Sequence, residues 1–308
     1  MRIRLAVSAL LAVFAAAQAA AQGAPVASAA DVAISQGRLD DAEQALFAAS
    51  SKATHEPSAR GALGMFLASR GHLKIGATLL EEARQFGGDA QVIDARLAKI
   101  YAWLGDWAAI AALKHYAASG PEEDRAKWLA THATSYSGAD SAVVQTEPND
   151  AFGLGRVVIT FNTAPVQMDI DPGVEGLVLP SWPVVAGASE QFGMRDSATV
   201  AVVRDFTIGA IHLSNVRARL SPSARPAIGL DVLAALEPTF DGVGHRLTLR
   251  RHNVAIAGEA LPILLGFPGV RFLPRAGQPP VTLESAAGRA ALRGTPWTFD
   301  LKRGAIMR

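Results

Sequence analysis

The chain has 308 residues, half of them hydrophobic, which is enough for two domains with cores of their own. Its net charge is +1, with 29 lysines and arginines spread among 28 aspartates and glutamates. No basic block is interleaved with aromatic residues, so the composition argues against nucleic acid as a partner.

Residues 1–21 have the order of a secretory signal peptide. Arg2 and Arg4 precede an apolar run that begins at Leu5, and small residues follow up to Ala21. The run is shorter than the ~20 residues that a membrane-spanning helix needs, which disfavours a membrane anchor. We therefore expect a secreted or periplasmic protein without a membrane span after signal removal. Because the chain has no cysteine, it must rely on its cores without disulfides.

Residues 22–135 are alanine-rich and have apolar residues at helical spacing. Three glycines lie 34 residues apart, each followed by an apolar residue two places later and by an alanine twelve places later: Gly37, Leu39 and Ala49; Gly71, Leu73 and Ala83; Gly105, Trp107 and Ala117. A 34-residue period is that of a helix-turn-helix unit that stacks on copies of itself, with the glycine in the turn.

This part of the chain resembles tetratricopeptide repeats (TPR). Residues 36–42 match the turn and the start of a second helix, and Leu63, Gly64 and Leu67 match a first helix, whereas Gly76 and Ile110 stand where alanine is usual. The resemblance implies either a partner protein bound on the concave face or packing against the next domain, and both alternatives remain open.

After one expected helix at Glu123–His132, the Gly, Ser, Pro, Asn and Asp content predicts a linker over residues 136–150. Residues 151–251 then show short β-branched runs separated by glycine and proline, which predicts a mostly antiparallel β domain. The fold class is thus α+β multidomain, helices first and strands second.

The triplet Asp171-Pro172-Gly173 closes the run Pro165–Ile170 and is the most informative motif. Around it, residues 155–251 resemble the retropepsin-like (single-lobe) aspartic protease family in its bacterial periplasmic branch. The matching pieces occur in the family's order: a strand at Arg156–Asn162, the strand and turn that carry Asp171, the stretch Phe206–Val216, a helix start within Ala227–Leu236, and a last hairpin at Asp241–Leu249.

The resemblance implies an acid-protease lobe in which Asp171 is the catalytic acid/base and Gly173 supports the turn. A single lobe brings one aspartate, so catalysis would require a homodimer in which two Asp171 carboxyls share a proton. The substrate would be a protein or peptide, the segment Ala186–Val203 would form the flap, and no cofactor would be required.

The chain also departs from the family's Asp-Thr/Ser-Gly-Ala-Ser/Thr pattern. Pro172 supplies neither the hydroxyl nor the backbone N–H of a threonine, and Glu175 and Asp169 would add negative charge near Asp171. The alternative is a catalytically inactive peptide-binding or scaffold protein, which holds an extended chain by strand addition.

The remaining residues indicate no further chemistry. The seven histidines lack the spacing of metal ligands, so we expect no metal. Residues 252–308 form a C-terminal extension that we expect to pack on the β domain, either covering an edge strand or completing the sheet of a dimer. In it, Ala260–Gly269 is expected to be an apolar loop, and Pro296–Leu301 alternates like a strand.

Overall fold

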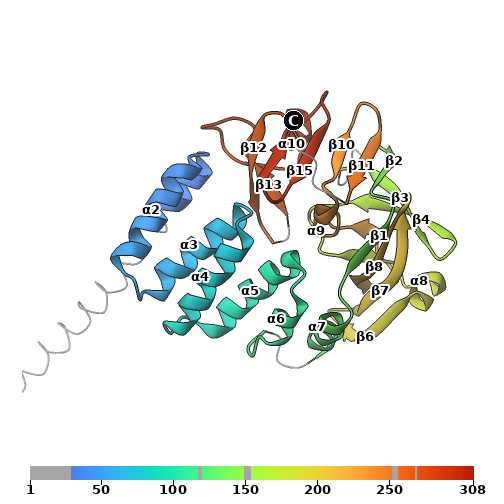
Figure 1. The fold of residues 1–308 in the computed structure, drawn as a ribbon, viewed down its shortest axis with the longest axis horizontal. Coiled ribbons are helices and arrows are strands. Elements are labelled where there is room, and N and C mark those ends of the chain that lie inside the picture. Colours follow the sequence, from blue (N-terminus) through green and yellow to red (C-terminus); the bar gives the residue numbers. More distant parts are fainter. Residues whose placement is uncertain (1–28, 117–119, 149–153, 252–255, 268) are drawn as a thin grey trace, which may run out of the picture.

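The computed structural model describes residues 29–116, 120–148, 154–251, 256–267 and 269–308. Helices come first and strands follow, as the sequence predicts (Figure 1). We call residues 29–131 the helical region, residues 135–251 the β lobe and residues 256–308 the C-terminal subdomain. The proposed signal peptide lies outside the described residues. No helix in the described ranges has the length and apolar character to cross a membrane.

The helical region is a stack in which each helix packs on the next. Its helices are α2 (Leu39–Lys52), α3 (Pro57–Ser69), α4 (Leu73–Gln85), α5 (Ala90–Leu104), α6 (Trp107–Ala111) and α7 (Pro121–Thr131). Glycine is required in the three turns because Gly37, Gly71 and Gly105 have φ of +72°, +86° and +69°. Each turn is followed by a helix that begins two residues later. Of the three repeat alanines, Ala83 is fully buried, Ala49 is partly buried, and Ala117 lies outside the described residues.

The β lobe is built around a closed ring of strands, because β3 pairs with both β4 and β7 and the order continues β4-β9-β5-β8-β7. Alternation along β3 buries Val157, Ile159 and Phe161 inside it. The strands of the lobe are β1 (Ser135–Gly138), β2 (Ser141–Glu147), β3 (Arg156–Phe161), β4 (Ala164–Ile170), β5 (Leu177–Leu179), β6 (Ser189–Arg195), β7 (Ala198–Ile208), β8 (Ile211–Leu220), β9 (Ala227–Ile228), β10 (Thr239–Asp241) and β11 (Arg246–Arg250). Short helices occur at α8 (Pro183–Gly187), α9 (Leu230–Leu233) and η1 (Ala234–Leu236).

The segment expected to be a linker, residues 136–150, contains strands instead. β1 pairs with β8, and β2 pairs with both β11 and β3. The serine- and glycine-containing composition does not decide the outcome, because strand formation depends on the neighbouring strands that are available.

The C-terminal subdomain continues the sheet of the β lobe, since β15 pairs with β10. It contains β12 (Ala260–Leu265), β13 (Val270–Phe272), β14 (Val281–Thr282), α10 (Ala286–Ala291), β15 (Trp297–Asp300) and β16 (Ala305–Met307). The prediction of a loop at Ala260–Gly269 is therefore wrong over most of that range, because Ala260–Leu265 forms β12. Pro262 is tolerated because β12 changes its partner there, from β16 to β13.

The C-terminal subdomain also lies against the helical region (Figure 1). A Cβ on Gly37 would be 2.0 Å from the Gln278 carbonyl oxygen, and one on Gly71 would be 2.8 Å from the Leu301 carbonyl oxygen. One hydrophobic cluster contains residues of all three parts, and a second joins α2 and α3 to Leu264 and Leu273. The parts therefore share buried cores.

Candidate functional site

Asp171 follows β4 directly, where the parallel pairing of β4 with β9 ends. Its backbone N–H donates to the Ile228 carbonyl at 3.0 Å, and its Oδ1 accepts from the Gly173 N–H at 2.8 Å. A Cβ on Gly173 would lie 3.1 Å from this Oδ1, so the close approach favours glycine. The two residues that the sequence singles out are thus in direct contact.

An arginine that sequence reasoning missed neutralises this site. Arg225 Nη2 lies 3.3 Å from Asp171 Oδ2, and Arg225 Nε lies 3.1 Å from Asp169 Oδ2. Arg156 approaches the other oxygen of Asp169 at 3.1 Å. The side chain of Asp171 is 20% exposed and that of Asp169 only 4%. Asp169 thus places an additional carboxylate near Asp171, as expected, but Arg156 and Arg225 compensate its negative charge.

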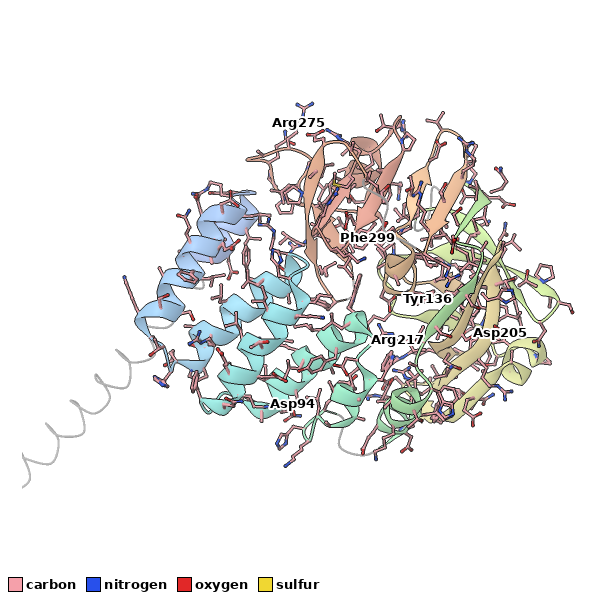
Figure 2. The ribbon with its side chains drawn as sticks, viewed as in Figure 1. Asp94, Tyr136, Asp205, Arg217, Arg275 and Phe299 are labelled. Atoms are coloured by element: carbon pink, nitrogen blue, oxygen red, sulfur yellow. The ribbon has the colours of Figure 1, made fainter. Side chains whose placement is uncertain are left out.

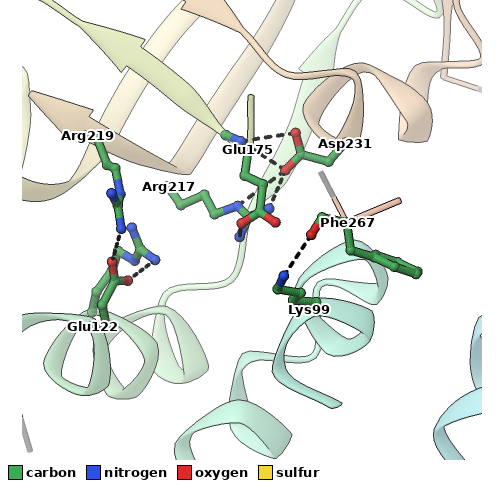
Figure 3. A network of polar contacts seen from close by, with 9 residues as sticks. Lys99, Glu122, Glu175, Arg217, Arg219, Asp231 and Phe267 are labelled. Carbon is green, nitrogen blue, oxygen red and sulfur yellow. Dashed lines mark hydrogen bonds and ion pairs between the residues drawn. The ribbon is translucent and has the colours of Figure 1, made fainter. Parts of the chain in front are cut away.

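Glu175 is directed to a different partner. Its Oε2 lies 3.3 Å from Nη1 of Arg217, whose Nη2 lies 2.7 Å from Asp231 Oδ2 (Figure 3). Asp231, on α9, also accepts from the Gly176 N–H through both oxygens at 3.0 Å. The loop from Asp171 to Gly176 is thus held at its start by β9 and at its end by Asp231.

The C-terminal subdomain contacts this loop directly, and the helical region contacts the C-terminal subdomain and β8. The Pro172 carbonyl accepts from the Gly269 N–H at 2.9 Å, and Lys99 of α5 donates to the Phe267 carbonyl at 2.9 Å (Figure 3). In α7, Glu122 pairs with Arg125 of its own helix and with Arg219 of β8. The C-terminal subdomain therefore contacts the Asp171 loop itself, and the helical region is joined both to that subdomain and to β8.

The expected flap at Ala186–Val203 differs at its start, because Ala186 and Gly187 belong to helix α8. The hairpin proper is formed by β6 and β7. It lies against α7, where the Phe192 and Trp128 rings are 6.2 Å apart and a Cβ on Gly193 would be 3.1 Å from Pro121. Helix α7 thus restrains one side of the hairpin.

The chemistry open to this site follows from its charges. Asp171 Oδ2 faces the Arg225 guanidinium at 3.3 Å, so this oxygen is engaged in an ion pair within its own lobe. The described part of the chain contains no group of three or more histidine, aspartate or glutamate side chains placed to hold a metal ion.

Comparisons with known proteins add little. No protein-family model matches the chain, and no curated protein matches its sequence. Among solved structures, a retropepsin-like aspartic protease from Rickettsia conorii matches 38% of this chain and 91% of its own length, with a TM-score of 0.29 and 12% sequence identity. A likeness of this size does not establish a shared family or activity.

Proposed function

We propose that this protein is an exported peptide-binding protein with a retropepsin-like β lobe that does not cleave its ligand through Asp171. The observation that carries the proposal is the ion pair between Asp171 and Arg225. Aspartic catalysis requires one proton shared between two carboxyls within hydrogen-bond distance. Here Asp171 Oδ2 already has a partner within its own lobe, because Arg225 Nη2 lies 3.3 Å away, and the Gly269 N–H already donates to the adjacent Pro172 carbonyl.

The edge of the β lobe is suited to hold an extended peptide. β6 stands at the end of the strand order and pairs only with β7 among the described strands. An extended chain can add to such an edge through backbone hydrogen bonds. Met194, near the end of β6, is 69% exposed and offers an apolar contact to a bound side chain. In this proposal the repeats of the helical region hold a second partner.

A second candidate is an aspartic endopeptidase that acts as a homodimer on protein substrates. It is favoured by the 20% exposure of the Asp171 side chain and by the Gly173 N–H that orients its carboxylate. Asp171 would pair with its copy only after Arg225 and Gly269 had moved away. We therefore place this candidate second.

The two candidates predict opposite results for proteolysis of a mixed peptide library from acid to neutral pH. We expect no cleavage by the wild type and none by Asp171→Asn, with a monomer in sedimentation. Cleavage by the wild type that Asp171→Asn abolishes would instead establish the endopeptidase.

Binding is tested with the same library by measuring the peptide retained by each variant. A charged side chain on an edge strand opposes strand addition. Met194→Lys should therefore reduce retention at least about tenfold, while Asp171→Asn should leave it unchanged. Val243→Lys, at an equally exposed position between β10 and β11, is the matched control and should bind like wild type. Equal retention by all variants would exclude β6 as the site.

A further inference from the structure

A groove with a volume of about 410 Å³ lies between α2 and α3 on the surface of the helical region. Its lining residues come from these two helices: Asp40, Glu43, Gln44 and Phe47 from α2, and Leu63 and Leu67 from α3. Figure 2 shows that α2 lies at the end of the helical region that is far from Arg217 and from the β lobe. The groove is therefore separate from Asp171 and from β6.

The groove exposes an aromatic side chain that no described residue covers. Phe47 is 64% exposed, whereas Leu63 is buried and Leu67 is half-buried. Both leucines pack in the hydrophobic cluster that joins α2 and α3 to the C-terminal subdomain. The apolar surface therefore continues from this cluster to the exposed ring. An aromatic side chain beside an apolar floor is typical of the residues that anchor a protein partner.

The α2 wall of the groove is acidic. Residues three and four positions apart share one face of a helix, so Asp40 and Glu43 lie on the same side of α2 as the aromatic ring. Neither carboxylate has an ion pair with a described residue, because Arg38 pairs with Asp41 at 2.5 Å instead. Lys52 stands at the other end of α2, about 120° around the helix from Asp40. The groove thus combines an apolar floor with two negative charges that lack a cation.

We propose that this groove binds an amphipathic helix of a partner protein. The apolar face of that helix covers Phe47, Leu63 and Leu67, because a groove between two helices suits a third. Its lysines or arginines lie beside Asp40 and Glu43. Since these acids are in the first half of α2, an antiparallel partner brings its C-terminal end to them, where cations also favour a helix. The inference rests on the proposed function, in which the helical region holds a second partner.

The test is fluorescence anisotropy of the full-length protein with a labelled amphipathic peptide that has leucines at helical spacing and lysines in its last two turns. We expect saturable binding, and we expect Phe47→Ser to weaken it at least about tenfold, as the loss of an aromatic anchor does. Ile75→Ser is the matched control. Ile75 lies on α4, is 55% exposed and does not line the groove, so this variant should bind like wild type.

The contribution of charge is tested with Glu43→Lys, because Asp40 also stabilises the start of α2 through the helix dipole. This variant should bind the lysine peptide about three- to tenfold more weakly than wild type does. It should bind a peptide with glutamates in place of the lysines more tightly than wild type does. An unchanged preference between the two peptides would contradict the proposed ion pairs.

Three results would overturn the proposal: no binding of the lysine peptide, equal binding by wild type and Phe47→Ser, or equal binding of a peptide in which prolines prevent helix formation. A dimer in sedimentation that Phe47→Ser dissociates would show instead that a second copy of the chain occupies the groove. Met194→Lys should bind the helical peptide like wild type. Failure of β6 as a peptide site and failure of this groove are therefore distinguishable.

Discussion

Arg217 pairs with Glu175 of the Asp171 loop, although it is not part of the motif. It is 8% exposed, it pairs with Asp231 and Glu175, and its guanidinium lies 5.8 Å from the centre of the Trp107 ring. Burial by itself would lower the pKa of Arg217, but the two carboxylates raise it above its ordinary value. Arg217 is therefore a permanent charge that compensates Glu175 within the loop and Asp231 beside it.

Arg217→Met should destabilise the protein by about 3–5 kcal/mol, because it leaves the carboxylate of Asp231 buried without its cation. The measurement is the free energy of unfolding in urea. Arg195→Met is the control, since the Arg195–Asp196 pair is exposed and 3.6 Å apart, and it should cost less than about 1 kcal/mol. Similar losses in both variants would show that the buried pair is not what stabilises the loop.

At the scale of elements, the repeat turns differ in what they contact. Gly37 and Gly105 have nearly the same φ, +72° and +69°, and occupy equivalent positions in the 34-residue repeat. A Cβ on Gly37 would meet the Gln278 carbonyl at 2.0 Å, whereas a Cβ on Gly105 would have no atom within 4 Å. The first turn is therefore a docking contact, and the third is not.

Gly105→Ala should lower the free energy of unfolding by only about 1–2 kcal/mol, which is the penalty for an alanine in the left-handed backbone conformation. Gly37→Ala should cost clearly more, because residues 275–278 must also move away. Urea unfolding measures both costs, and hydrogen exchange should become faster at residues 273–278 in Gly37→Ala alone. Equal costs and unchanged exchange would mean that this loop does not dock on the first turn.

The sequence predicts those elements whose cause is local. The 34-residue spacing locates the glycine turns, alternation locates β3 and β4, and the triplet Asp171-Pro172-Gly173 locates the turn after β4. It does not reveal β1 and β2, whose polar composition is typical of loops until β8 and β11 provide partners. Nor does it reveal Arg225, which is 54 positions from Asp171 and is brought there by the β4–β9 pairing. Contacts of this kind depend on the fold rather than on any local pattern.

At the scale of the whole molecule, the C-terminal subdomain is coupled to the Asp171 loop through charge as well as packing. Glu284 follows Leu283, whose N–H donates to the Val270 carbonyl. Val270 in turn follows Gly269, whose N–H donates to the Pro172 carbonyl of the loop. The Oε2 atom of Glu284 is buried and has no hydrogen-bond partner among the described residues. Burial raises the pKa of Glu284, and the negative charge of Asp171 raises it further.

This raised pKa makes stability depend on pH in a defined direction. The folded protein holds the Glu284 proton more tightly than the unfolded chain does. The stabilisation that protonated Glu284 contributes is therefore complete below the pKa of Glu284 in the unfolded chain, and it is lost as pH rises through the pKa of Glu284 in the folded protein. Glu284→Gln should therefore unfold like wild type at acid pH and be more stable than wild type at neutral pH, as measured by urea unfolding at a series of pH values. Asp171→Asn removes the neighbouring charge but keeps Glu284. It should therefore reduce the pH dependence of stability, and the part that is due to the burial of Glu284 should remain. If Asp171→Asn left the pH dependence unchanged, the two carboxyls would not interact, and the C-terminal subdomain would be coupled to the loop by packing and backbone hydrogen bonds alone.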